Sequence, residues 1–161
     1  MNSVEEKVDG SIRIAVIKLA AKPKPILIIG ACMPCRGVIN ADTDFLESLD
    51  VISEIINKYG HTCDIILTGD MNASLTRQTP NSRDSMFLNF IKDHHILTPS
   101  CMDEINTYYR PSGSSQTQID YVLESKIGLK CTYKTLKRRP LDTSQHHPVG
   151  IDLTIELDYS A

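Results

Sequence analysis

An acidic residue and an amide residue stand two positions apart, directly after a short apolar run. Asp70 and Asn72 belong to the segment Thr68-Gly-Asp-Met-Asn72, which follows Asp64-Ile-Ile-Leu67. Side chains two residues apart emerge on the same side of an extended chain, and paired oxygen donors suit Mg²⁺. The same residues are also typical of an ordinary turn, so this segment alone leaves both interpretations open.

Two later segments favour a functional site over a plain turn. Asp120 interrupts the otherwise apolar stretch 118–123, and His146 lies in Ser144-Gln-His-His-Pro148, ahead of the last apolar segment. A buried carboxylate is costly without a partner, and a histidine held by a carboxylate can stabilise developing negative charge. The sequence therefore favours acid–base chemistry at these positions.

Cys32 and Cys35 form a Cys-x-x-Cys pair after an apolar run, which suggests redox chemistry as a further hypothesis. Redox motifs of the thioredoxin type open a helix directly, whereas residues 36–40 continue as a loop. A zinc site is less favoured still, because the chain's two His-His pairs are adjacent rather than spaced three to five residues apart. We expect two free, partly buried thiols.

Hydrophobic periodicity predicts the strands that must position these residues. Alternation over 12–19 and the β-branched run 26–29, separated by Pro23 and Pro25, predict a hairpin. Further strands are predicted at 64–67, 118–123, 130–136 and 149–157.

Two segments have helical periodicity. The first places an apolar face at Phe45, Leu49, Ile52, Ile56 and Tyr59. Asp44 with Glu47 is expected to cap its start, Lys58 suits its negative end, and Gly60 suits a left-handed exit. A shorter helix is predicted at 84–92, with Met86, Phe87, Phe90 and Ile91 facing inward. Strands with intervening helices indicate an α/β or α+β architecture.

Composition limits the class of protein. With 161 residues, of which 41% are hydrophobic and 23% charged, the chain fits one globular domain. We expect a polar tail at 1–11 and a single domain at 12–158. The apolar run 26–33 is too short to span a membrane. Five scattered cysteines without a secretory signal favour reduced thiols and an intracellular location.

Charge is unevenly distributed along the chain. A net charge of −3 would ordinarily count against a nucleic-acid partner. Residues 126–139, however, contain no acidic residue and six basic ones: Lys126, Lys130, Lys134, Lys137, Arg138 and Arg139. A solvated strand edge and a phosphate-facing patch both remain open as interpretations.

Four motifs, in this order, resemble those of the endonuclease/exonuclease/phosphatase superfamily. They are Cys32-Met-Pro34, Gly69-Asp-Met-Asn72, Gln118-Ile-Asp-Tyr-Val-Leu123 and Ser144-Gln-His-His-Pro-Val149. The segment Met33-Pro-Cys-Arg-Gly37 is most similar to the endonuclease domains of non-LTR retrotransposons. The resemblance covers about residues 12–157. It implies an α/β (α+β) sandwich, the C-terminal portion of the four-layer, DNase I-like fold.

The resemblance also implies an activity and a set of site residues. The activity is endonuclease-like hydrolysis of DNA phosphodiesters with Mg²⁺, or with Mn²⁺ as the alternative metal, and a DNA substrate is consistent with the nucleus. Asp70 would orient or deprotonate the attacking water, Asn72 would hold that water or the phosphate, and Asp120 would pair with His146 at the scissile phosphate. The implied metal ligands are Asp70, Asn72 and His146. The implied substrate contacts are Asn72, Thr107, Ser115, Ser144 and His146.

The sequence departs from the family pattern at three places. The family's Asn-containing first strand and metal-binding Glu have no counterpart before Ile12, Cys32 stands where Tyr is usual, and Gln145 stands where Asp is usual. Fewer acidic ligands predict weak or absent catalysis, so the competing hypothesis is a non-catalytic nucleic-acid-binding or interaction remnant. The strands expected to be missing would leave a sheet face uncovered, which predicts dimerisation or binding of the rest of the domain there.

Overall fold

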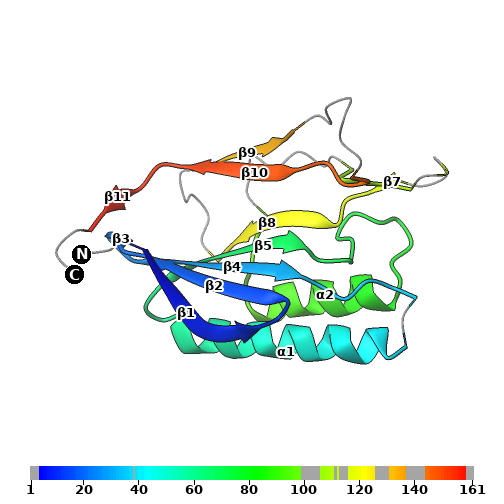
Figure 1. Ribbon diagram of the computed structural model, residues 1–161, viewed down its shortest axis with the longest axis horizontal. Coiled ribbons are helices and arrows are strands. Elements are labelled where there is room, and N and C mark those ends of the chain that lie inside the picture. The colour runs from blue at the N-terminus through cyan, green and yellow to red at the C-terminus, as the bar shows by residue number, and fades with distance from the viewer. Residues whose placement is uncertain are drawn as a thin grey trace.

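The computed structural model describes residues 4–37, 39–98, 106–110, 112, 116–125, 131–136 and 144–158. These residues form helices and strands in the following order (Figure 1): β1 (Val4–Ser11), β2 (Ile14–Leu19), β3 (Ala21–Lys22), β4 (Ile26–Cys32), α1 (Ala41–Tyr59), β5 (Asp64–Asp70), α2 (Ser82–Asp93), β6 (Tyr108–Tyr109), β7 (Gln116–Thr117), β8 (Asp120–Glu124), β9 (Cys131–Thr135), β10 (Val149–Leu153) and β11 (Glu156–Leu157).

The largest sheet is mixed and has the strand order β1-β2-β4-β5-β8. β4 and β5 run parallel, with α1 between them in the chain, and the other neighbouring pairs run antiparallel. The expected hairpin is confirmed as β2 and β4, although the short β3 lies between them. Because β4 and β5 are parallel, they end at the same edge of the sheet, and the candidate residues lie at that edge.

The expected polar tail at 1–11 is wrong for the described residues, because Val4–Ser11 form β1. This strand pairs with β2 from Val4 opposite Leu19 to Ser11 opposite Ile14, with a register shift between Lys7 and Ser11. An edge strand needs backbone pairing on one side only and tolerates charged side chains. The polar composition of residues 4–11 therefore gave no indication of a strand. These residues nevertheless belong to the large sheet.

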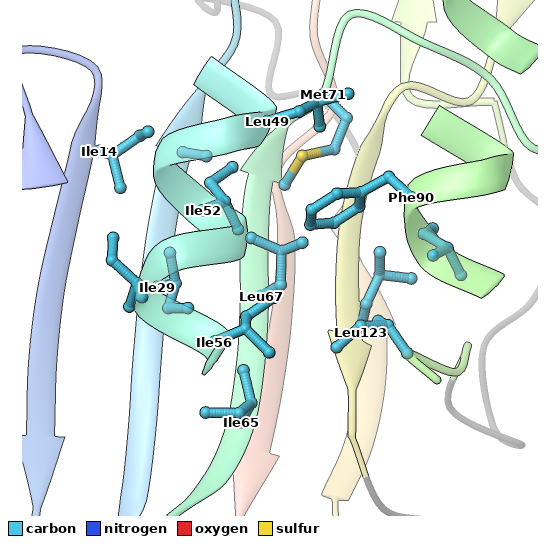
Figure 2. Close-up of a cluster of buried hydrophobic side chains, with 14 of the residues drawn as sticks. Ile14, Ile29, Leu49, Ile52, Ile56, Ile65, Leu67, Met71, Phe90 and Leu123 are labelled. Atoms are coloured by element: carbon cyan, nitrogen blue, oxygen red, sulfur yellow. The ribbon is translucent and has the colours of Figure 1, made fainter. Parts of the chain in front are cut away.

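Both helices cover one face of the large sheet (Figure 1). The expected apolar face of α1 is confirmed, since Phe45, Leu49, Ile52 and Ile56 are buried and Tyr59 packs against them. Figure 2 shows Leu49, Ile52 and Ile56 of α1 packed against side chains of the sheet, namely Ile29, Ile65, Leu67 and Leu123. α2 adds Phe87, Phe90 and Ile91 to the same cluster, as its periodicity predicts. This core fixes the helices on the strands that carry the site.

The ends of α1 differ from the sequence prediction. The helix begins at Ala41, not at Asp44, and its N-cap residue Asn40 has φ 62° and makes no side-chain capping hydrogen bond. Gly60 has right-handed dihedral angles (φ −60°, ψ −25°), so the expected left-handed exit is wrong. By contrast, α2 has a complete capping box, in which Asn81 accepts from Arg83 and Asp84 backbone amides and the Asp84 carboxylate accepts from the Asn81 amide.

The opposite face of the large sheet is covered by the β9–β10 pair. A second apolar cluster lies there, formed by Ala21, Ile26, Ile66, Val122 and Tyr133. The alternating segment 149–157 does not make one strand, because β10 pairs with β9 whereas β11 pairs with β3. The described chain is therefore layered as helices, large sheet and β9–β10.

Candidate active site

Asp70 is the last residue of β5, at the edge where β4 also ends. Cys32 of β4 is its neighbour in the parallel register, and Gly69 lies opposite Ala31. Gly69 has φ 130°, and a Cβ atom there would lie 1.9 Å from the Ala31 carbonyl oxygen. Only glycine fits so close an approach of two backbones. The Gly-Asp pair thus brings the carboxylate to the end of the sheet without splitting β4 from β5.

Asn72 holds the Asp70 carboxylate from both sides. Its backbone N–H donates to Oδ1 of Asp70 at 2.9 Å, and its Nδ2 donates to Oδ2 at 3.0 Å. Nδ2 also donates to the Met33 carbonyl oxygen at 3.0 Å. Both Nδ2 hydrogens are therefore used within the protein. Only Oδ1 of Asn72 is left to accept from a water or to bind a cation.

Asp120 begins β8 and lies directly opposite Asp70 in the antiparallel register. Thr107 positions it, because the Thr107 hydroxyl oxygen accepts from the backbone amides of Ile119 (3.1 Å) and Asp120 (3.0 Å). The Thr107 side chain is fully buried at 0% exposure and does not line the cleft described below, and the substrate contact expected there remains a prediction. Thr107 supports the acidic residue from within the fold.

His146 contacts Asp120, as the resemblance implied. Its Nδ1 lies 3.0 Å from Oδ2 and 3.2 Å from Oδ1 of that carboxylate. Ser144 is exposed and accepts from the His146 backbone amide at 3.0 Å, which fixes the turn before the histidine. The Tyr108 ring packs on the imidazole, with centroids 5.1 Å apart. With Nδ1 facing a carboxylate, Nε2 is the nitrogen left for a ligand.

Asp70, Asp120 and His146 form one cluster of potential metal ligands. One ligand atom from each lies within 4.8 Å of the others. Burial is the main cause that raises the pKa of Asp70 above 3.8, and the nearby Asp120 charge raises it further, against the lowering effects of Asn72 and His146. A cation beside two facing carboxylates relieves this repulsion. The donor set therefore fits a divalent metal ion.

A cleft of about 600 Å³ opens over this cluster. Its lining includes Asp70, Asn72 and His146 together with three arginines, Arg36, Arg77 and Arg110. Arg36 and Arg110 are exposed, while Arg77 also pairs with Asp84 at 2.9 Å. The Asp70 carboxylate can bind a metal ion, and the three arginines, here called the basic rim of the cleft, can bind the phosphates of a phosphodiester.

Sequence reasoning missed the basic rim and Tyr108. The three arginines come from separate segments that have no common motif, so only folding reveals their proximity. Arg36 belongs to the Met33–Gly37 segment that carries the family resemblance, but that segment by itself does not predict that Arg36 lines the cleft. Tyr108 and His146 are joined by an isolated β-bridge, a contact without a sequence signal.

The remaining candidates fall into two groups. Cys32 and Cys35 are free and exposed, which corrects the expected partial burial, and Cys35 also lines the cleft. Ser115 lies outside the described residues, as do Lys126, Lys130, Lys137, Arg138 and Arg139. Lys134 is exposed and forms an ion pair with Asp152.

No helix among the described residues is long and apolar enough to span a membrane.

Solved structures with the same fold are numerous. The endonuclease domain of TRAS1, a telomere-specific non-LTR retrotransposon, has a TM-score of 0.72 at 14% identity, over 93% of this chain and 68% of that one. The 3′ phosphatase NExo from Neisseria, bound to product DNA hairpin, has a TM-score of 0.64 at 13% identity, over 98% and 71%. An endonuclease/exonuclease/phosphatase family protein from Leptotrichia buccalis has a TM-score of 0.61 at 17% identity, over 98% and 61%. No curated protein matches the sequence.

The fold and the sequence pattern together define the class of protein. The fold is the DNase I-like fold of the endonuclease/exonuclease/phosphatase superfamily. Within it, the sequence pattern described as endonuclease-reverse transcriptase matches residues 32–150, and the chain belongs to that family. The predicted superfamily and fold class are confirmed. Family and neighbours together point to phosphoester hydrolysis of the nuclease or phosphatase type.

Proposed function

We propose that the chain is a metal-assisted endonuclease that hydrolyses phosphodiester bonds of DNA. The observation that carries this proposal is the cluster of Asp70, Asp120 and His146 within 4.8 Å, of which Asp70 and His146 line the cleft together with three arginines. Hydrolysis of a phosphodiester needs a positioned water and neutralisation of the charge that develops on the phosphoryl oxygens. The cluster and the rim offer groups for both tasks.

Asp70 and Asn72 act on the attacking water. Asp70 is held in one orientation by the two hydrogen bonds from Asn72, and its raised pKa favours acceptance of a proton. Oδ1 of Asn72 accepts from the water, since its Nδ2 hydrogens are already used. The phosphate contact expected for Asn72 is therefore not part of this proposal. Its free Oδ1 can accept from the water or bind the metal ion.

His146 and Asp120 act on the phosphate. Asp120 accepts from Nδ1–H and stabilises the protonated imidazole, so that Nε2–H can donate to a phosphoryl oxygen. Arg36, Arg77 and Arg110 hold the flanking phosphates at the rim of the cleft. Ser144 keeps the histidine turn in place and is exposed to solvent, and its contact with the substrate remains a prediction of the resemblance.

A divalent cation fits beside Asp70 and Asn72. The resemblance also implies His146 as a metal ligand, but in this proposal its Nδ1 is held by Asp120 and its Nε2 is assigned to the phosphate, so His146 does not bind the metal ion. When bound, such an ion supplies Lewis-acid stabilisation of negative charge on the phosphoryl oxygens. Mg²⁺ is the proposed ion because carboxylate and amide oxygens predominate among these ligands, and Mn²⁺ is the alternative.

Nicking of supercoiled plasmid DNA tests the proposal. The chain is expected to convert supercoiled to open-circular DNA with Mg²⁺ and not with EDTA, and Asp70→Asn is expected to lower the rate about 10²–10⁴-fold. Asp50→Asn is the matched control, because Asp50 is an exposed carboxylate in the middle of α1. Equal rates for the chain and Asp70→Asn would refute the assigned chemistry.

Nucleic-acid binding without cleavage is the second candidate function. It is favoured by one observation: Asp120 is engaged by His146, which leaves Asp70 as the carboxylate that faces the cleft. A weak metal site would reduce turnover while the basic rim still binds phosphates. DNA affinity that falls steeply with salt, together with no nicking in Mg²⁺ or Mn²⁺, would establish this alternative.

A further inference from the structure

A loop without helix or strand joins β5 to α2 and brings Arg77 to the cleft. It covers residues 71–81, so it begins directly after Asp70. Asn72 and Arg77 of this loop both line the cleft. The conformation of the loop therefore determines where the Arg77 guanidinium lies relative to the Asp70 carboxylate.

A buried carboxylate, that of Asp84 in the first turn of α2, holds this loop from inside the fold. The Asp84 side chain is only 1% exposed. Its Oδ1 accepts from the Ser74 backbone amide at 2.7 Å, and its Oδ2 accepts from the Asn81 backbone amide at 2.9 Å. The side-chain amide of Asn81 also donates to Oδ2, at 2.5 Å. Asp84 therefore holds the chain both before and after Arg77.

Arg77 contacts the same carboxylate through one edge of its guanidinium. Nε of Arg77 lies 2.9 Å from Oδ2 of Asp84, while the Arg77 side chain is 37% exposed. A guanidinium is planar and rigid, so a contact at Nε fixes the plane of the whole group. The described residues provide no further partner for this guanidinium, and Nη1 and Nη2 are therefore left as donors for a ligand.

The other two arginines of the basic rim have no such contact. Arg36 and Arg110 are exposed, and neither pairs with a carboxylate of the described chain. An exposed arginine loses rotamer freedom when it binds a phosphate, whereas Arg77 is oriented beforehand. The rim therefore contains two arginines that mainly supply charge and one whose direction is fixed by the fold.

Two Nη groups of an oriented guanidinium match a phosphate, which can accept from both at once. We propose that Asp84 is a positioning residue that orients Arg77 for two-point binding of one DNA phosphate in the cleft. This inference rests on the proposed function, because it takes DNA as the ligand of the cleft. Arg77 then places the strand relative to Asp70, while Arg36 and Arg110 attract its phosphates. Asp84 itself is buried and touches no substrate.

Binding of a fluorescent DNA duplex in EDTA tests the role of Arg77 without cleavage. Arg77→Gln is expected to lower the affinity about tenfold and to reduce the slope of log affinity against log salt concentration by about one unit. Arg77→Lys keeps the charge but has no fork for two-point binding, so we expect a similar loss of affinity with the slope of the parent chain.

Arg13→Lys is the matched control, because Arg13 is exposed and does not line the cleft. It is expected to bind the duplex as the parent chain does. An Arg77→Lys variant that also binds as tightly as the parent chain would show that only the charge of Arg77 matters, and would overturn the proposal.

Asp84→Asn separates orientation from simple electrostatics by the sign of its effect. It removes a negative charge beside Arg77, so an effect of charge alone would strengthen DNA binding. Loss of the Arg77 orientation would weaken binding instead, and this is the expected result. Stronger binding would contradict the proposal. Circular dichroism shows whether the variant is folded, and if it is not, the comparison of Arg77→Lys with Arg13→Lys decides.

A double-variant cycle separates orientation of Arg77 from a general effect of Asp84 on the loop. If Asp84 acts through Arg77, Asp84→Asn should cause no further loss of affinity once Arg77→Gln is present. Losses that multiply would mean that Asp84 only holds the loop, and the positioning role would be refuted.

The plasmid nicking assay fails or succeeds separately from these measurements. The expected pattern of binding together with no nicking would refute the proposed hydrolysis and leave the positioning role of Asp84 intact. A parent chain that does not bind the duplex would refute both.

Discussion

Asp70 is the residue at which the needs of folding and of chemistry conflict. It faces Asp120 across β5 and β8 in a partly buried position, and burial together with that neighbouring charge raises its pKa. Asn72 offsets part of the cost by donating two hydrogen bonds. A carboxylate kept in such a position despite the cost suggests that a cation completes the site.

The first prediction concerns the stability of Asp70→Asn. A raised pKa means that the folded chain holds the Asp70 proton more tightly than the unfolded chain, so stability falls as the pH rises from 3.8 through the raised value. At pH 7.5 in EDTA, Asp70→Asn is therefore expected to melt at a higher temperature than the parent chain. The difference should shrink as the pH approaches 3.8.

Mg²⁺ should reverse the order of the two proteins. It binds the folded parent chain and raises its melting temperature by mass action, but it is expected to have little effect on Asp70→Asn. Thermal melts without Mg²⁺ and with about 10 mM Mg²⁺ measure both effects. A parent chain that is indifferent to Mg²⁺ and Mn²⁺ would count against a metal site at Asp70.

The second prediction concerns the pair of Asp120 and His146. The carboxylate acts through the imidazole, with which it is in contact at 3.0 Å, so removal of either group should remove the same contribution. Asp120→Asn and His146→Gln are each expected to lower the nicking rate about 10²–10³-fold. The double variant should be no slower than the slower single one. Losses that multiply would mean that the two side chains act separately.

At the scale of elements, pairing of β5 with β4 and β8 assembles the site. Asp70 is opposite Cys32 on one side and opposite Asp120 on the other. Gly69 permits the close approach of β4, and the buried Thr107 hydroxyl holds the start of β8. A site on paired strands is more rigid than a site on loops, which suits the alignment of water and phosphate.

The third prediction separates this supporting role of Thr107 from substrate binding. Thr107→Val leaves the amides of Ile119 and Asp120 without their acceptor, and we expect a loss of about 2 kcal/mol of unfolding free energy. Thr107→Ser keeps the hydroxyl and should recover most of that loss. Urea denaturation measures both variants. Unchanged stability in Thr107→Val, with weaker DNA binding, would support the substrate contact expected from the resemblance.

At the scale of the whole molecule, charges from distant segments converge on one end of the sheet. Arg36 follows β4, Arg77 follows β5 and Arg110 follows β6, yet all three line the cleft. The overall charge of −3 therefore says little about nucleic-acid binding, because the local field at the cleft is set by a few residues. Dimerisation, or binding of further chain on the sheet face, remains a prediction.

The fourth prediction follows from this basic rim. A side chain that neutralises one phosphate contributes about one unit to the slope of log affinity against log salt concentration. Arg36→Gln and Arg110→Gln are each expected to reduce that slope by about one unit. Lys92→Gln, near the far end of α2 and exposed, is the control and should leave the slope unchanged. Equal slopes in all variants would mean that DNA does not contact the rim.

Elements with a local residue pattern could be predicted from the sequence. The period of α1, the apolar runs of β4 and β5, and the Gly-Asp-x-Asn turn are all visible over a few neighbouring residues, and the order of the four motifs identified the superfamily. The ends of α1 were predicted incorrectly, because glycine, asparagine and aspartate each occur in several backbone conformations near helix ends. Gly60 ends α1 without a left-handed conformation, and Asn40 rather than Asp44 precedes the helix.

The contacts between distant side chains could not be predicted from the sequence and follow from the tertiary structure. The polar strand β1, the buried role of Thr107 and the contact of Tyr108 with His146 all depend on residues far apart in the chain. Hydrogen-bond satisfaction and the local field are properties of three-dimensional neighbours, which residue spacing does not encode. The motifs therefore identified the candidate catalytic residues. The packing of strands and helices determined which side chains, hydrogen bonds and charges surround them.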